Sequence, residues 1–83
     1  MTIMPRVSTP SQVGALLTAR RKALGLSQAA VASRLGISQN RLSELETEPA
    51  HLTLDRLLAL TGLLGLDLVL QEKAKLPAPR SEW

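Results

Sequence analysis

The spacing of apolar residues over most of the chain predicts four helices. Each is preceded by a hydroxyl residue that can cap its first turn: Thr9, Ser27, Ser38 and Thr53. Three are followed by a glycine that can adopt the left-handed conformation of a helix end: Gly25, Gly36 and Gly65. The third stops before Pro49, since proline disfavours helical conformation in the preceding residue. We therefore expect helices over about residues 10–24, 28–35, 39–48 and 54–64.

After Gly65 the apolar pattern changes from a helical period to alternation. Leu66, Leu68 and Leu70 alternate with Asp67, Val69 and Gln71, as in a half-buried strand. No second segment of the chain alternates well, so this strand would have to pair with another chain. We expect an all-α fold of four to five helices plus one C-terminal β-strand that is shared across a homodimer. The residues of that contact are Leu66, Leu68, Val69 and Leu70.

Composition narrows the possible functions. Hydrophobic residues make up 45% of the chain and aromatic ones only 1%, so the core must be aliphatic. The absence of cysteine excludes disulfides, cysteine-ligated zinc and thiol catalysis. His51 is the one histidine and has no cluster of carboxylates beside it, so we expect no metal, no cofactor and no enzymatic activity. No apolar run approaches the roughly 20 residues of a membrane helix, and we expect a cytoplasmic protein without membrane contact.

The charges are unevenly distributed along the chain. Residues 1–43 hold six basic residues and no acid, a net charge of +6. Residues 44–83 hold four bases and seven acids, a net charge of −3. A basic first half favours a surface that faces a polyanion such as DNA.

The second and third predicted helices have the spacing of a helix-turn-helix. Counting Gln28 as the first position, Ala32 stands fifth, where the helices cross and a small residue is needed, and Gly36 stands ninth, in the turn. Aliphatic residues fill the positions that join the two helices: Val31, Leu35, Ile37, Leu42 and Leu45. The alternative is an ordinary helical hairpin.

The sequence LGLSQAAVASRLGISQNRLSELE resembles the helix-turn-helix of the phage-repressor and Xre family, in which GLSQ followed by GISQ recurs. This resemblance runs from about Val13 to Leu66 and implies a lambda-repressor-like fold. Beyond it, Glu48-Pro49, a leucine-rich helix and the sequence LDLVLQEK are similar to HipB-type antitoxins. Proteins of that type dimerise through such a strand and bind a HipA-type kinase toxin.

The third helix is the predicted recognition helix. Leu42 and Leu45 share one side of it, so the opposite side presents four polar residues, which we expect to read bases: Gln39, Asn40, Ser43 and Glu44. The family resemblance implies base contacts at three of them, Gln39, Asn40 and Glu44. Glu44 departs from the family pattern, because relatives often carry a neutral or basic residue at this position.

Other residues of the first three helices are expected to contact DNA phosphates or to hold the recognition helix in place. We expect the DNA phosphates to be contacted from residues of the second and third helices: Ser27, Gln28, Arg34, Ser38 and Arg41. For Gln28 this role is implied by the resemblance. Arg21 and Glu46 match a family pair that ties the first helix to the recognition helix, a structural role.

The two ends of the chain are expected to be flexible, unlike the folded domain between them. We expect a flexible N-terminal arm over residues 1–8, a DNA-binding and dimerisation domain over 9–73, and a flexible tail over 74–83. The tail contains Pro77 and Pro79 and ends in Trp83, the one aromatic residue of the chain, which we interpret as an anchor for a partner.

The patterns together predict a repressor that binds a palindromic operator in double-stranded DNA. The resemblance to HipB-type proteins implies, more narrowly, the antitoxin of a toxin-antitoxin operon that represses its own transcription. Two alternatives stay open: a free-standing Xre-type repressor without a toxin, and a helical protein-protein adaptor that does not touch DNA.

Overall fold

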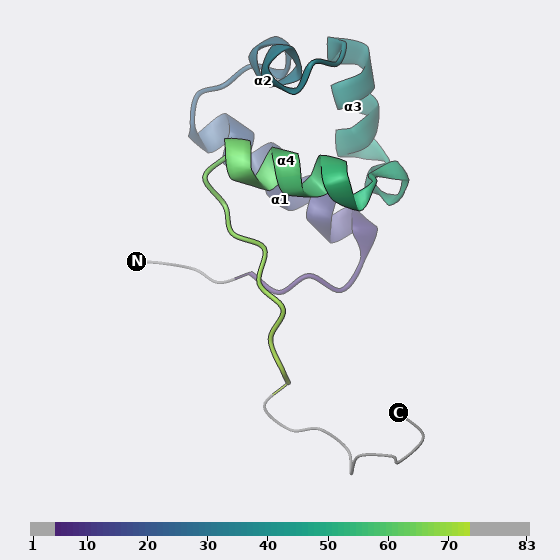
Figure 1. The fold of residues 1–83 in the computed structure, drawn as a ribbon, viewed down its shortest axis with the longest axis vertical. Helices are drawn as coiled ribbons and strands as arrows, with labels where there is room; N and C mark the ends of the chain where they lie inside the picture. Colours follow the sequence, from purple (N-terminus) through teal and green to yellow (C-terminus); the bar gives the residue numbers. More distant parts are fainter. Residues whose placement is uncertain (1–4, 74–83) are drawn as a thin grey trace.

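The computed structural model of the protein describes residues 5–73 and shows an all-α fold there (Figure 1). It contains the helices α1 (Pro10–Ala23), α2 (Gln28–Leu35), α3 (Gln39–Thr47) and α4 (Leu54–Leu63), with a short 3-10 helix, η1 (Pro49–His51), between the last two. The four predicted helices are confirmed, with ends that differ by at most one residue from the expected ones. None of the described helices is long and apolar enough to span a membrane.

Side chains at the predicted positions cap the helices. The hydroxyl of Thr9 accepts from the Gln12 amide at 3.3 Å, and Gln12 Oε1 accepts from the Thr9 amide at 3.2 Å, which completes a capping box. Ser27, Ser38 and Thr53 cap α2, α3 and α4 in the same way, each accepting from the amide three residues later. At the end of α2, Gly36 has a φ of 72°, a conformation that favours glycine and that turns the chain into α3.

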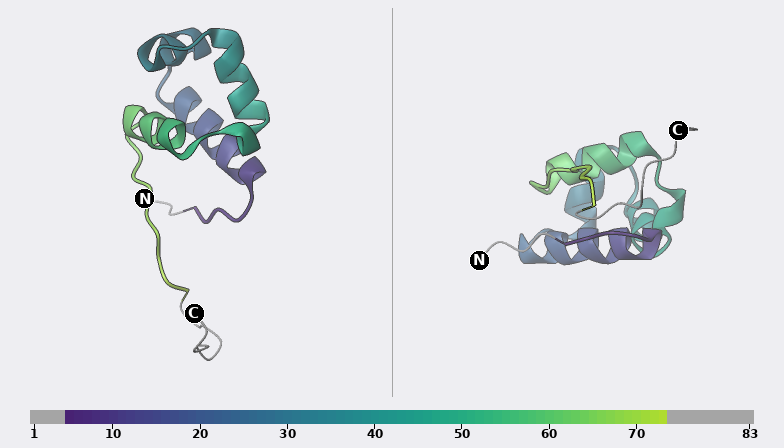
Figure 2. Two further views of the ribbon diagram at one scale, coloured as in Figure 1. Left: turned by 45° about the vertical axis from the view of Figure 1, so that its right-hand side comes forward. Right: turned by 90° about the horizontal axis from the view of Figure 1, so that it is seen from below.

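The core lies between the four helices and is aliphatic, as the composition predicts. Figures 1 and 2 show α2 and α3 next to each other, against α1 and α4. Every helix contributes to the core, whose residues are at most 3% exposed: Leu17, Val31, Ala32, Leu42, Leu45, Leu60 and Leu64. Ala32 is 2% exposed on α2, which packs on α3.

The predicted strand is not formed in the single chain. After α4, residues 66–73 run away from the helices without helical or strand structure (Figure 1; Figure 2, left). Leu66 is half-buried, whereas Leu68, Val69 and Leu70 are exposed. A strand forms only beside a partner strand, and the described part of this chain supplies none. Pairing with a second chain therefore stays a prediction.

Part of the expected domain organisation concerns residues outside those described. Residues 5–8, the described part of the N-terminal arm, are exposed and form neither helix nor strand. Residues 1–4 and the tail 74–83, with Trp83, lie outside the described residues.

Candidate nucleic-acid interface

The exposed side of α3 carries the residues that were predicted to read bases. Leu42 and Leu45 are 0% and 3% exposed and fasten the helix to the core. On its other sides Gln39, Asn40 and Glu44 are exposed and Ser43 is half-buried. Amide, hydroxyl and carboxylate groups on one exposed helix can match the hydrogen-bonding edges of bases in a major groove.

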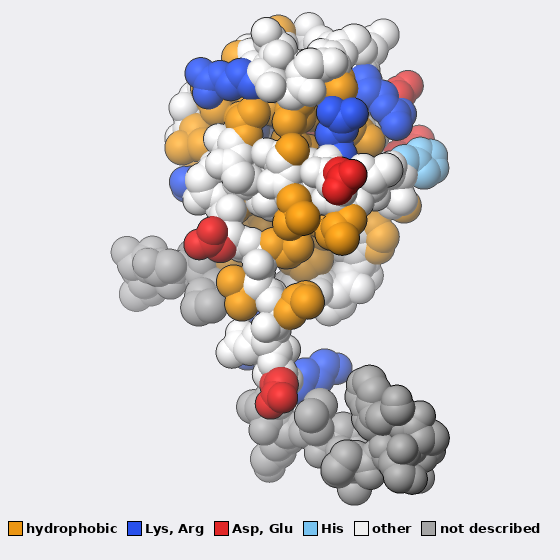
Figure 3. Space-filling model, in the orientation of Figure 1, with side chains coloured by type: hydrophobic (Ala, Val, Ile, Leu, Met, Phe, Trp, Pro, Cys, Tyr) orange, Lys and Arg blue, Asp and Glu red, His pale blue; other side chains and the backbone are white. Residues whose placement is uncertain are grey.

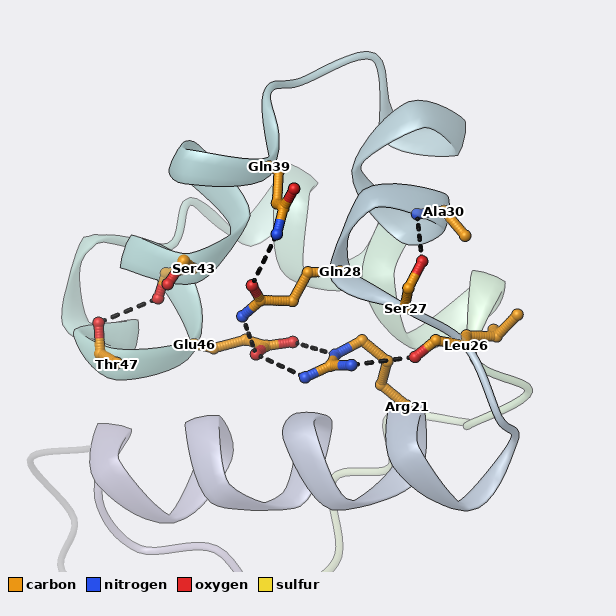
Figure 4. Close-up of polar contacts among 9 residues, drawn as sticks. All are labelled: Arg21, Leu26, Ser27, Gln28, Ala30, Gln39, Ser43, Glu46 and Thr47. Atoms are coloured by element: carbon orange, nitrogen blue, oxygen red, sulfur yellow. Dashed lines mark hydrogen bonds and ion pairs between the residues drawn. The ribbon is translucent and has the colours of Figure 1, made fainter.

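A buried ion pair fixes α3 to α1. Arg21 Nε donates to Glu46 Oε2 at 2.7 Å, and Arg21 Nη2 donates to Glu46 Oε1 at 3.2 Å (Figure 4). The two side chains are only 10% and 8% exposed. Arg21 Nη1 also donates to the carbonyl oxygen of Leu26, at 2.9 Å, in the connection between α1 and α2. The structural pair implied by the family resemblance thus joins three parts of the chain.

Gln28 extends this network toward the exposed end of α3. Its Nε2 donates to Glu46 Oε1 at 3.0 Å, and its Oε1 accepts from Gln39 Nε2 at 3.5 Å (Figure 4). Gln28 was expected to contact phosphate, and the structure places its side chain, half-buried, between Glu46 and Gln39. The side chain of Gln39 is thereby linked to the ion pair.

The pKa of Glu46 is lowered from its ordinary value. Burial by itself raises the pKa of this carboxyl, but the hydrogen bonds from Arg21 and Gln28 and the charge of Arg21 together outweigh burial. The network therefore holds Glu46 as a carboxylate at neutral pH.

We expect the stability of the fold to fall when Glu46 becomes protonated in acid. Because its pKa is lower in the folded than in the unfolded chain, its contribution is fully present above the unfolded pKa of about 4.3. The contribution is lost as the pH falls through the folded pKa. Thermal unfolding between pH 6 and pH 3 should show a steeper loss of stability for the natural chain than for Glu46→Gln. Equal slopes for the two proteins would contradict this prediction.

Arg41 and Glu44 form a second, exposed ion pair on α3. Arg41 Nη1 lies 3.2 Å from Glu44 Oε1, and the side chains are 50% and 68% exposed. Such a pair adds little stability. The charge of Arg41 nevertheless offsets part of the repulsion between Glu44 and DNA phosphates. An acidic residue at this position of the recognition helix is therefore less unfavourable for DNA binding than it would be without Arg41.

The other predicted phosphate contacts lie at the starts of α2 and α3 and at the end of α2. The hydroxyls of Ser27 and Ser38 accept from the amides of Ala30 and Arg41, each at 3.0 Å, and so serve as helix caps. Arg34 is exposed in the last turn of α2. Helix starts attract anions, and both serines stand at such starts, which keeps them compatible with a phosphate nearby.

The sequence pattern did not predict two hydrogen bonds and one close approach that hold the helices in position. Arg20 Nε donates to the carbonyl oxygen of Leu64 at 2.8 Å, and Arg56 Nη1 donates to that of Leu35 at 3.3 Å. A Cβ added to Gly14 would lie 2.5 Å from the carbonyl oxygen of Glu46 and 2.7 Å from Pro49 Cγ. These residues join segments that are distant in sequence, so only the folded chain reveals their roles.

The described residues contain no group of three or more His, Asp or Glu side chains that could hold a metal ion. Comparison with protein families finds a match to a family model described as "Helix-turn-helix", over residues 17–71. The matched region begins in α1 and includes α2, α3 and α4. Comparison with curated proteins gives no match.

Proposed function

The chain belongs to the helix-turn-helix family of DNA-binding regulators, and from this premise we propose that it is a repressor that reads a specific sequence in double-stranded DNA with α3. The observation that carries the proposal is the exposed polar side of α3. Gln39 and Asn40 can each pair with an adenine through two hydrogen bonds, while Ser43 can bond to several bases. Glu44 can accept from cytosine, with its charge partly offset by Arg41.

Replacement of Asn40 by alanine is expected to weaken binding to the operator while leaving binding to random DNA almost unchanged. The expected loss on the operator is about 1–3 kcal/mol, because a base-specific hydrogen-bonding pair is removed. The measurement is a titration of both DNAs at one salt concentration, on an operator obtained by selection from random sequences.

Arg41→Ala is the control on the same helix. We expect it to weaken binding to operator and random DNA alike, since a phosphate contact carries no sequence information. Equal losses on both DNAs for Asn40→Ala would overturn the groove assignment of α3. Absence of DNA binding by the natural chain even at low salt would favour the protein-protein adaptor instead.

We further propose that the repressor is a homodimer that pairs antiparallel near Val69. The apolar contact of this pairing is supplied by four residues of the segment after α4: Leu66, Leu68, Val69 and Leu70. A two-fold dimer addresses two half-sites of a palindromic operator about 34 Å apart, one turn of DNA. Val69→Pro should dissociate the dimer by removing a backbone donor from the strand pair. A natural chain that is monomeric at micromolar concentration in light scattering would overturn this proposal.

A narrower proposal is that the regulator is the antitoxin of a HipA-type kinase toxin. It is supported by the resemblance of residues 66–73 and the preceding leucine-rich helix to HipB-type proteins. The test is to look for an adjacent or overlapping gene for a kinase-like protein and to measure whether the two gene products co-purify. Their absence would favour a free-standing repressor.

A further inference from the structure

Exposed apolar side chains gather on α4 and on the segment that follows it. Among the described residues, seven large hydrophobic side chains are at least 43% exposed, and five of them lie in this part of the chain. The five are Leu54 at 65%, Leu58 at 47%, Leu68 at 48%, Val69 at 65% and Leu70 at 95%. Figure 3 shows hydrophobic side chains along the lower side of α4 and continuing down the segment. We call these five residues the α4 surface.

The core of the single chain does not cover this surface. Leu60, in the second half of α4, and Leu64, directly after the helix, are 2% and 1% exposed and fill the core. Leu54 and Leu58 stand four residues apart on one exposed row of the helix, about 120° around its axis from Leu60 and Leu64. A contiguous exposed apolar surface of this kind in a small domain marks a site of protein contact.

We propose that a second copy of the chain covers the α4 surface, so that Leu54 and Leu58 form part of the dimer contact together with residues 66–70. This inference rests on the proposed dimer and extends its contact from the segment to α4. In that dimer, the outer row of α4 lies against the even-numbered leucines of the paired segments, which share one face of an extended chain: Leu66, Leu68 and Leu70.

The backbone of the segment favours a partner that can form a strand. Leu66 donates to the carbonyl oxygen of Thr61 at 2.8 Å, but residues 67–73 make no backbone hydrogen bond to any described residue. A second copy presents the same unpaired backbone, so one contact can satisfy both chains.

The charges of the segment favour the antiparallel arrangement. Asp67 stands near its start and Lys73 near its end, and in an extended chain both odd-numbered residues lie on the same face. Antiparallel pairing centred at Val69 places Asp67 of one copy opposite Gln71 of the other and diagonal to Lys73, a separation that long side chains can bridge. Parallel pairing would place Asp67 beside the Asp67 of the second copy, an unfavourable contact.

The test is the effect of Leu58→Asp on dimerisation of the full chain, measured by sedimentation equilibrium. A charge in the apolar contact should raise the dimer dissociation constant by about 100-fold. Leu54→Asp, at a more exposed position, should act in the same direction. Circular dichroism should show unchanged helix content in both variants, because neither side chain belongs to the core.

Leu24→Asp is the matched control, since Leu24 is 43% exposed at the end of α1, outside the α4 surface. It should leave the dissociation constant within about threefold of the natural value. If Leu58→Asp and Leu54→Asp dimerise as Leu24→Asp does, while Val69→Pro is monomeric, the inference is wrong and the proposed dimer stands. If the natural chain itself is monomeric, both are wrong.

Discussion

Arg21→Ala is expected to lower the free energy of unfolding by about 3–5 kcal/mol. The change leaves the carboxylate of Glu46, whose side chain is 8% exposed, without its charged partner. It also removes the hydrogen bond to the Leu26 carbonyl. Such a loss approaches the whole stability of a domain of this size. Urea unfolding followed by circular dichroism measures it.

Two further variants separate the ion pair from a general effect of truncation. Lys22→Ala, at the exposed neighbouring position on α1, should change stability by no more than about 0.5 kcal/mol. The double variant Arg21→Met, Glu46→Leu should recover much of the loss, because no buried charge then lacks a partner. If the double variant is less stable than Arg21→Ala, the buried carboxylate is not the cause of the loss.

Gly14→Ala is expected to destabilise the fold by about 3 kcal/mol and to weaken operator binding. The new Cβ would lie 2.5 Å from the carbonyl oxygen of Glu46, which is backbone and cannot turn aside as a side chain can. The end of α3 must therefore move away from α1, and the base-reading residues move with it. Operator affinity, measured at a temperature where the variant is fully folded, should fall by about tenfold.

Gly62→Ala is the control for this prediction. Within the single chain, a Cβ at Gly62 would meet no atom beyond its own helix backbone within 4 Å, and alanine is the better helix residue. We expect a gain of about 0.5–1 kcal/mol in the free energy of unfolding. Equal effects of the two substitutions would show that the close approach of α1 and α3 at Gly14 does not decide the position of the recognition helix.

The sequence by itself determined the helices of this protein and the side of α3 that faces outward. Caps and helix ends are local features: Ser38 bonds to an amide three residues away, and Gly36 supplies a turn that other residues resist. The burial of Leu42 and Leu45 follows from the helical period alone, and with it the exposure of Asn40. Such features can be predicted because they depend on neighbours within one or two turns.

Only the tertiary structure decided how the recognition helix is held. The bonds of Gln28 to Glu46 and Gln39, of Arg20 to Leu64 and of Arg56 to Leu35 join residues between 11 and 44 positions apart. The packing of the helices sets which of these polar atoms meet. The strand predicted from Leu66 onward is not present in the single chain for a related reason, and its pairing with a second chain stays a prediction. Its alternating pattern describes a surface suited to pairing, but a strand also needs a partner, which one chain does not contain in its described part.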